Sequence, residues 1–200
     1  DLGFYTEQCR HNDGHRLAGA WSQTRKLTAT PATSEAYFGS AVDIDGSTLA
    51  IGADGADTTG TDAGAVHIVD AADGWTQTDR LVASDGSASD YFGEAVAVGS
   101  DIVVVGAPGD EHGTGETAGA AYVFERTESG WTETKLTAGG AGASFGQSVA
   151  VAGGTVAIGA DGVTHAGEDE AGAVYLFEPT EGDWVRTATL TPTSPTAQGY

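Results

Sequence analysis

Residues 38–53 read FGSAVDIDGSTLAIGA, and the pattern returns twice without a gap, as FGEAVAVGSDIVVVGA over residues 92–107 and FGQSVAVAGGTVAIGA over residues 145–160. Each copy is followed by a Gly-led apolar segment and then by a segment led by Trp75, Trp131 or Trp184. The repeating unit is therefore about 54 residues long. Four strands in a unit of this length predict an all-β chain built of β-propeller blades, each a four-stranded antiparallel sheet.

The pattern inside a unit predicts how the strands pack. Val96 and Val98 alternate with small residues, the period of two typical of a strand that packs on one side. Gly153-Gly154 marks a tight hairpin turn between the first two strands. The glycines that end the second strand would let neighbouring backbones approach closely, which is a packing role. These glycines are Gly52, Gly106 and Gly159.

The period also predicts boundaries. We expect blades over residues 37–81, 91–136 and 144–190, an isolated outer strand over residues 21–27, an irregular segment over residues 1–20 and the start of the next linker over residues 191–200. The outer strand is expected because WSQTRKL at residues 21–27 matches WTQTDRL at residues 75–81. Because closed propellers have roughly four to eight blades, we expect these three and a half blades to be part of a longer polypeptide.

Together these motifs resemble FG-GAP repeats, the units of the integrin α propeller and of many microbial surface proteins. The resemblance covers residues 21–200 and rests on Phe-Gly, the Val-rich strand, Gly106-Ala107-Pro108 and the Gly-Ala-x-Tyr-Val-Phe strand from Gly119. It implies a propeller of about seven blades in the intact protein, extracellular or at the cell surface, that binds a protein or glycan ligand at one face. The structural anchors of the repeat are Phe38, Gly39, Phe92, Gly93, Phe145, Gly146, Gly52, Gly106, Gly159, Trp21, Trp75, Trp131 and Trp184.

The charge of the chain limits its partners. Eight basic residues stand against 29 acidic ones, a net charge of −21, so nucleic acid and anionic membrane surfaces would be repelled. No apolar run approaches the ~20 residues of a membrane span, and we expect no direct membrane insertion. An acidic surface with only Lys26 and Lys135 as lysines resembles that of a halophilic archaeal surface protein. A moderately acidic mesophilic surface protein is the alternative.

Two sets of acids are candidate ligand sites. Many FG-GAP repeats hold calcium between their first two strands, and Asp43 and Asp45 are the calcium candidates here, although the connection is short and a plain hairpin is favoured, with no cofactor. The connections between second and third strands carry more acids, and a propeller places them on one face. These acids predict a cation-assisted or cationic-ligand site, the alternative being carboxylates that only hydrate halophilic loops. They are Asp54, Asp57, Asp62, Asp110, Glu111, Glu116, Asp161, Glu168 and Asp169.

Catalysis would need residues that break the repeat, and comparison of the copies reveals no such set. The sequence contains no Gly-x-Ser-x-Gly elbow and no His-Glu-x-x-His helix. His67 stands where the other copies have Tyr122 and Tyr175, so we expect it to cover a blade face. We therefore predict a non-catalytic binding or adhesion module, the alternatives being a passive structural envelope repeat and a polysaccharide-acting hydrolase.

Overall fold

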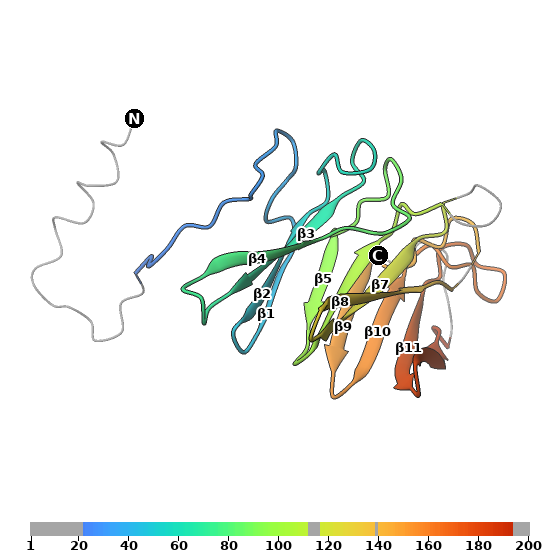
Figure 1. Ribbon diagram of the computed structural model, residues 1–200. Helices are drawn as coiled ribbons and strands as arrows, with labels where there is room; N and C mark the ends of the chain where they lie inside the picture. Colours follow the sequence, from blue (N-terminus) through green and yellow to red (C-terminus); the bar gives the residue numbers. More distant parts are fainter. Residues whose placement is uncertain (1–21, 112–116, 139, 194–200) are drawn as a thin grey trace, which may run out of the picture.

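The computed structural model describes residues 22–111, 117–138 and 140–193, and it confirms the all-β fold (Figure 1). Within this part of the chain, three four-stranded antiparallel sheets follow one another. The first holds β1 (Val42–Asp45), β2 (Thr48–Ala53), β3 (Ala65–Asp70) and β4 (Thr76–Leu81). The second holds β5 (Ala95–Val98), β6 (Ile102–Ala107), β7 (Ala120–Thr127) and β8 (Gly130–Leu136). The third holds β9 (Ser148–Ala152), β10 (Thr155–Ala160), β11 (Ala173–Thr180) and β12 (Asp183–Leu190).

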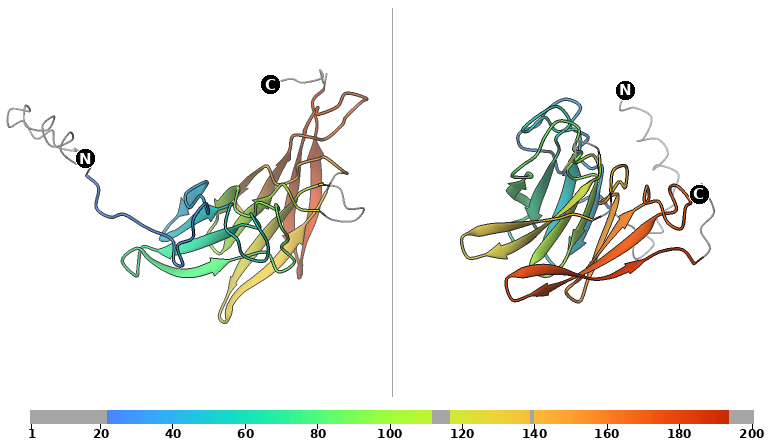
Figure 2. Two further views of the ribbon diagram at one scale, coloured as in Figure 1. Left: turned by 90° about the horizontal axis from the view of Figure 1, so that it is seen from above. Right: turned by 90° about the vertical axis from the view of Figure 1, so that its right-hand side faces the viewer.

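The sheets, named blades 1 to 3 below, stand side by side in chain order (Figures 1 and 2). The first strands β1, β5 and β9 contact one another in turn, whereas β4, β8 and β12 form the far edges of their sheets. Consecutive blades of a propeller take this arrangement. The described residues form three such blades and not a closed ring.

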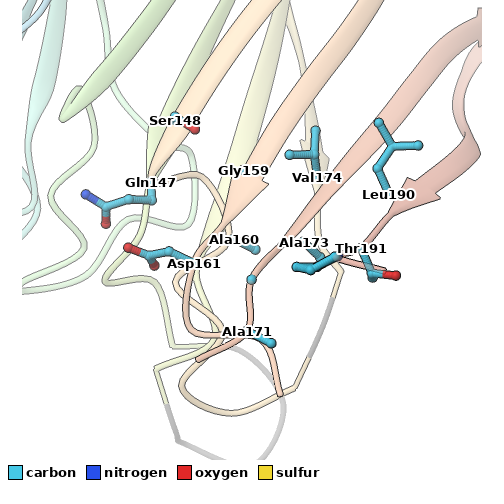
Figure 3. A pocket seen from close by; sticks show the side chains of 12 residues that line it. Gln147, Ser148, Gly159, Ala160, Asp161, Ala171, Ala173, Val174, Leu190 and Thr191 are labelled. Atoms are coloured by element: carbon cyan, nitrogen blue, oxygen red, sulfur yellow. The ribbon is translucent and has the colours of Figure 1, made fainter. Parts of the chain in front are cut away.

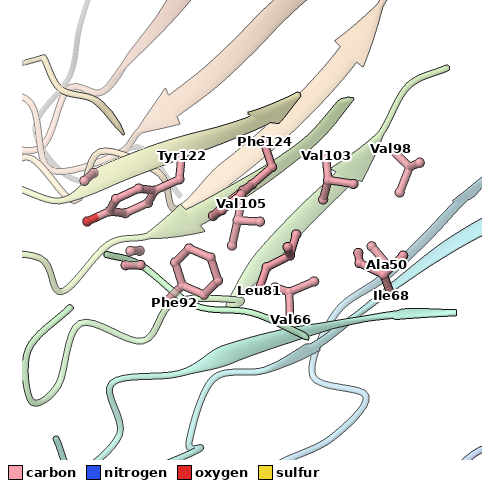
Figure 4. Packing of buried hydrophobic residues seen from close by; sticks show 13 residues of the cluster. Ala50, Val66, Ile68, Leu81, Phe92, Val98, Val103, Val105, Tyr122 and Phe124 are labelled. Atoms are coloured by element: carbon pink, nitrogen blue, oxygen red, sulfur yellow. The ribbon is translucent and has the colours of Figure 1, made fainter. Parts of the chain in front are cut away.

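The core lies between blades, not within them, because a single sheet cannot bury its own faces. One face of blade 1, with Val66 and Leu81, packs against the opposite face of blade 2 (Figure 4). There Phe92 is fully buried, with its ring 5.4 Å from that of Tyr122 and 5.8 Å from that of Phe124, both in edge contact. Blades 2 and 3 repeat this packing around Phe145. We call the face of a blade that carries its Phe-Gly residues the leading face and the other the trailing face.

The glycines of the repeat sit where the backbones of two blades meet. Gly93 has φ +101°, and a Cβ there would lie 2.6 Å from the carbonyl oxygen of Ala65 in the preceding blade. A Cβ at Gly106 would collide with the carbonyl oxygen of Gly146 in the following blade. Steric exclusion thus accounts for both the Phe-Gly and the Gly-Ala motifs.

The predicted outer strand over residues 21–27 requires correction, because residues 22–29 lie in no strand. A fourth strand needs a third strand beside it, and β3 of blade 1 already pairs with β4. The segment instead runs beside blade 1, where Gln77 accepts a hydrogen bond from Thr30 N (3.1 Å) and donates one to Thr30 O (2.8 Å). Trp21 and the expected segments 1–20 and 194–200 lie outside the described residues.

His67 does cover a blade face. It is 2 % exposed, its ring packs edge-on against Phe38, and its Nδ1 is 3.0 Å from Gln77 Oε1. Burial lowers the pKa of its imidazole, which keeps the ring neutral. Within the described ranges, no helix is long and apolar enough to span a bilayer.

Candidate functional site

In each blade the strands run antiparallel in chain order, so the connections between them emerge at two opposite edges of the sheet. The β2–β3, β6–β7 and β10–β11 connections and the two interblade linkers emerge on one edge, and the hairpin turns of β1–β2, β5–β6 and β9–β10 on the other (Figure 1). We call the first edge the loop face and the second the hairpin edge. The loop face therefore gathers the acidic connections that the sequence singled out.

In blade 1 the predicted ligand residues are tied into their own loop. Asp57 is exposed, and its Oδ1 accepts a hydrogen bond from the backbone N–H of Asp62 (3.0 Å). Asp54 is half-buried, and no partner for its buried Oδ1 lies among the described residues. Of these acids, Asp57 is the one whose side chain bonds within the loop, and it is also the one that is exposed.

The acids of blades 2 and 3 stand on separate loops. Glu111 is exposed, and Glu116 lies outside the described residues. Asp161 and Asp169 are exposed, and Thr164 donates a hydrogen bond to Asp169 (3.1 Å). Glu168 is paired with His165 through the backbone, at 3.0 Å in both directions. In the part of the chain that is described, no three His, Cys, Asp or Glu side chains come together as a metal site.

Asp110 differs from the other loop acids because it points into the protein. It is 2 % exposed, and its Oδ2 accepts hydrogen bonds from Tyr122 Oη and Lys135 Nζ, both at 2.8 Å. Asp85 in the linker between blades 1 and 2 accepts a hydrogen bond from Lys135 Nζ (2.6 Å) and lies 2.8 Å from Tyr122 Oη, whose single hydroxyl proton is shared between the two carboxylates. Asp90, also in this linker, is buried and accepts a bond from Ser87 N (2.6 Å). We call Asp85, Asp90, Asp110, Tyr122 and Lys135 the charged cluster.

Burial and the contacts between carboxylates and one ammonium group set the pKa values in the charged cluster. For Asp85, burial raises the pKa, but the bonds from Lys135 and Tyr122 outweigh it and leave the pKa lowered. For Asp90, burial, aided by the nearby negative charge of Asp110, leaves the pKa raised despite the bond from Ser87. Burial lowers the pKa of Lys135, but Asp110 and Asp85 overcome this and raise it.

These states give the cluster a structural character. Burial and the adjacent Asp110 carboxylate raise the pKa of Tyr122 strongly, so its hydroxyl stays protonated. Lys135 stays charged for the reason above, and neither group is a nucleophile or base at neutral pH. Through the contact of Asp85 with Lys135, the cluster instead joins the interblade linker to blade 2.

The charged cluster breaks the repeat, and the sequence comparison missed it. At the position of Asp110, blade 1 has Ala56 and blade 3 has Val163. At the position of Asp90, the other copies have Ala36 and Ala143. A comparison of the repeat copies outside the strands would have revealed that these two positions differ between the copies. The sequence comparison looked for catalytic residues that depart from the repeat, whereas the charged cluster is a structural set that departs from it.

The calcium candidates lie toward the hairpin edge. Asp43 Oδ2 accepts a hydrogen bond from Val98 N of blade 2 (2.7 Å), so this carboxylate joins the first strands of two blades. Asp45 is exposed at the end of β1. The arrangement fits a plain hairpin with one acid used in packing.

The comparisons with known proteins agree with the repeat pattern. A family model described as FG-GAP repeat matches residues 21–69, 75–124 and 131–177. No curated protein matches the chain significantly.

Proposed function

The chain belongs to the FG-GAP repeat family, and from this premise we propose that it is a non-catalytic binding or adhesion module. We place it outside the cell or at the cell surface, with a protein or glycan as its ligand. Its ligand carries cationic groups and contacts the loop face. No bound metal is part of the proposal.

The observation that carries the proposal is the position of solvent-exposed carboxylates on the loop face. Asp57, Asp161 and Asp169 are exposed on the connections of blades 1 and 3. Separate loops on one edge can contact a broad surface, the way that a rigid scaffold presents binding residues. The net charge of −21 favours the approach of a positive ligand and raises its association rate.

A halophilic archaeal source is part of the proposal. The excess of 29 acidic over 8 basic residues supports it. At about 1 M salt the Debye length falls to about 3 Å, so carboxylates on neighbouring loops hardly repel one another. In that setting, ligand recognition depends on short-range contacts more than on long-range attraction.

The test compares two triple variants with the same change of charge. The loop variant carries Asp57→Asn, Asp161→Asn and Asp169→Asn. The matched control carries the same change at three acids in or beside hairpin turns away from the loop face, as Asp45→Asn, Asp101→Asn and Asp183→Asn. Both chains and the parent are screened at fixed salt against an array of glycans and against basic and acidic proteins.

We expect saturable binding that the loop variant loses and the control keeps. Equal loss in both variants would mean that bulk charge alone attracts the ligand. The appearance of new reducing ends on any glycan would contradict the non-catalytic part of the proposal.

A further inference from the structure

A tyrosine side chain is exposed on the loop face in the middle of the structure. Tyr91 ends the linker between blades 1 and 2 and is 38 % exposed. Because Tyr91 stands between two described blades, the lack of a neighbouring blade does not explain its exposure. The other exposed large apolar side chains of the described residues belong to blade 1, to the linker before it or to blade 3. They are Tyr37, Val42, Ile44, Val174, Val185 and Leu190.

The conformation of Tyr91 is fixed by its neighbours. Its φ is +55°, which is uncommon for a residue with a bulky side chain. Its N–H donates to the carbonyl oxygen of Asp62 in blade 1 (3.1 Å), and its own carbonyl accepts from Glu94 N (3.0 Å). A Cβ at Gly109 would lie 2.9 Å from Cδ2 of Tyr91, so the ring lies against the β6–β7 connection. A strained residue held in one exposed conformation suits binding, because little freedom remains to be lost when a ligand arrives.

Acidic loops flank Tyr91 on both sides. On the side of blade 1, Asp62, whose carbonyl bonds Tyr91, donates its own N–H to the exposed carboxylate of Asp57 (3.0 Å). On the side of blade 2, exposed Glu111 follows Gly109 in the β6–β7 connection. An ammonium group brought to this ring would therefore have both an electron-rich aromatic face and carboxylates within the same surface.

The same geometry occurs one repeat earlier. Tyr37 has φ +51°, and its carbonyl accepts a hydrogen bond from Ser40 N (2.9 Å). A Cβ at Gly55 would lie 2.5 Å from Cδ2 of Tyr37, so this ring too lies against a glycine of its own β2–β3 connection. Two consecutive blades thus hold a tyrosine in one conformation at the same place.

In blade 3 the same position has the backbone but not the ring. Ser144 has φ +50°, and its carbonyl accepts from Gln147 N (3.1 Å). Gln147 lines the same pocket as the exposed Asp161 (Figure 3). Gly162 stands at the position of Gly55 and Gly109. Blade 3 therefore offers a natural comparison, a site with the acid and without the aromatic side chain.

We propose that Tyr91 and Tyr37 are stacking residues for a glycan whose sugars carry amino groups. This inference rests on the proposed function and specifies its ligand. The C–H groups on the face of a sugar ring carry small positive charges and pack on the electron-rich face of a tyrosine. A protonated amine on the sugar is attracted to the same ring and to the carboxylates of the adjacent loops. A polymer of one sugar suits a surface that repeats the same ring from blade to blade.

The experiment measures the binding of glucosamine oligomers to the full chain by isothermal titration calorimetry. It uses one fixed salt concentration and a mildly acidic pH, at which the amines are protonated and exposed carboxylates are ionised. N-acetylglucosamine oligomers of the same linkage and length keep the ring face and lack the charge. We expect saturable binding of the glucosamine oligomers and weaker binding of the acetylated ones. No saturation with glucosamine oligomers, or tighter binding of the acetylated ones, would overturn the proposal.

Substitutions at Tyr91 separate its aromatic face from its bulk. Tyr91→Leu keeps an apolar side chain beside Gly109 and removes the aromatic face, so we expect binding to weaken about fivefold. Tyr91→Phe keeps the ring and should stay within about twofold of the parent. Val185→Ala, at an exposed apolar residue of β12, should leave binding unchanged.

Ser144→Tyr tests the proposal by a gain of binding. The backbone there already has the conformation of the two tyrosine positions, and the side chain is half-buried at most. We expect the added ring to tighten binding about fivefold for oligomers long enough to reach it, an effect that a loss of folding cannot imitate. Glucosamine binding that is unchanged in both Tyr91→Leu and Ser144→Tyr would overturn the proposal.

The loop variant separates a failure of this inference from a failure of the proposed function. Glucosamine binding that the loop variant loses and Tyr91→Leu keeps would overturn the stacking role and leave the carboxylates as the binding groups. The opposite result would support stacking and contradict the role proposed for those carboxylates. A parent chain that binds basic proteins but no glucosamine oligomer would overturn the glycan assignment and leave the loop face as a protein-binding surface.

Discussion

The two lysines of the chain form a matched pair for measuring what the charged cluster contributes. Lys135 is partly buried, with 24 % of its side chain exposed, and contacts two carboxylates, whereas Lys26 is exposed. Methionine replaces the aliphatic part of either lysine side chain with an unbranched chain and removes the same charge. Lys135→Met removes the ammonium group that lies 2.8 Å from Asp110, whose side chain is 3 % exposed.

The expected cost follows from the burial of the two partners. Removing one partner of a fully buried ion pair costs about 3–5 kcal/mol. Here Lys135 retains some access to water, and Tyr122 still donates to Asp110, so we expect about 2 kcal/mol. With a urea dependence of about 2 kcal/mol per molar, the unfolding midpoint of Lys135→Met falls by about 1 M.

Urea unfolding followed by tryptophan fluorescence, at one fixed salt concentration, measures this shift. Lys26→Met should change stability by less than about 0.5 kcal/mol, as surface substitutions usually do. Adding Asp110→Asn to Lys135→Met should recover part of the loss, because the buried negative charge at Asp110 is then removed as well. Equal midpoints for the two lysine variants would refute the assignment of an interior ionic link.

Three further predictions concern pH, salt and packing. The pKa of Asp90 is raised in the folded state, so its ionised form lowers the free energy of unfolding at pH values above that pKa. Asp90→Asn should therefore stabilise the chain at pH 7. The urea midpoints of the parent and the variant should converge below about pH 4, where the carboxyl group is protonated in both states. If the surface is halophilic, dialysis from about 2 M to about 0.01 M salt should abolish the strand signal in circular dichroism, since the Debye length then grows to about 30 Å; an unchanged spectrum would exclude that adaptation. Phe92→Ala should cost about 3–5 kcal/mol in urea unfolding because the ring is fully buried between two blades, whereas Phe38→Ala, whose ring is half-buried, should cost about 1 kcal/mol.

The repeat made the fold predictable, because a gapless pattern reports contacts that every blade makes with its neighbour. A phenylalanine recurs at the position of Phe92 because its ring packs against the aromatic rings of its own sheet. A glycine recurs at the position of Gly106 because the backbone of the next blade lies against it. The segment over residues 22–27 failed as a strand for a related reason. It carries the side chains of an outer strand, but pairing depends on a partner sheet and is not a property of the segment itself.

A comparison of the copies could show that Asp90 and Asp110 depart from the repeat, but not that they join one cluster, because its members are spread over a linker, a loop and two strands. Asp85 and Lys135 are 50 residues apart, and only the return of β8 beside β7 brings them to 2.6 Å. A repeat reports what the copies share, whereas this cluster exists in one copy only. The sequence therefore shows which positions depart from the repeat, whereas their assembly into one cluster depends on the three-dimensional structure.

Gly159 shows that the same glycine of the repeat has different neighbours in different blades. A glycine inside a strand costs about 0.5–1 kcal/mol relative to alanine, so a physical reason is expected wherever it occurs. At Gly106 the reason is visible, since a Cβ would strike the backbone of the next blade. Gly159 does not have a positive φ, and among the described residues only the Ser148 side chain comes close to its Cβ position. A Cβ there would collide with the Ser148 hydroxyl of the neighbouring strand β9, so the Ser148 side chain accounts for the glycine within blade 3 itself.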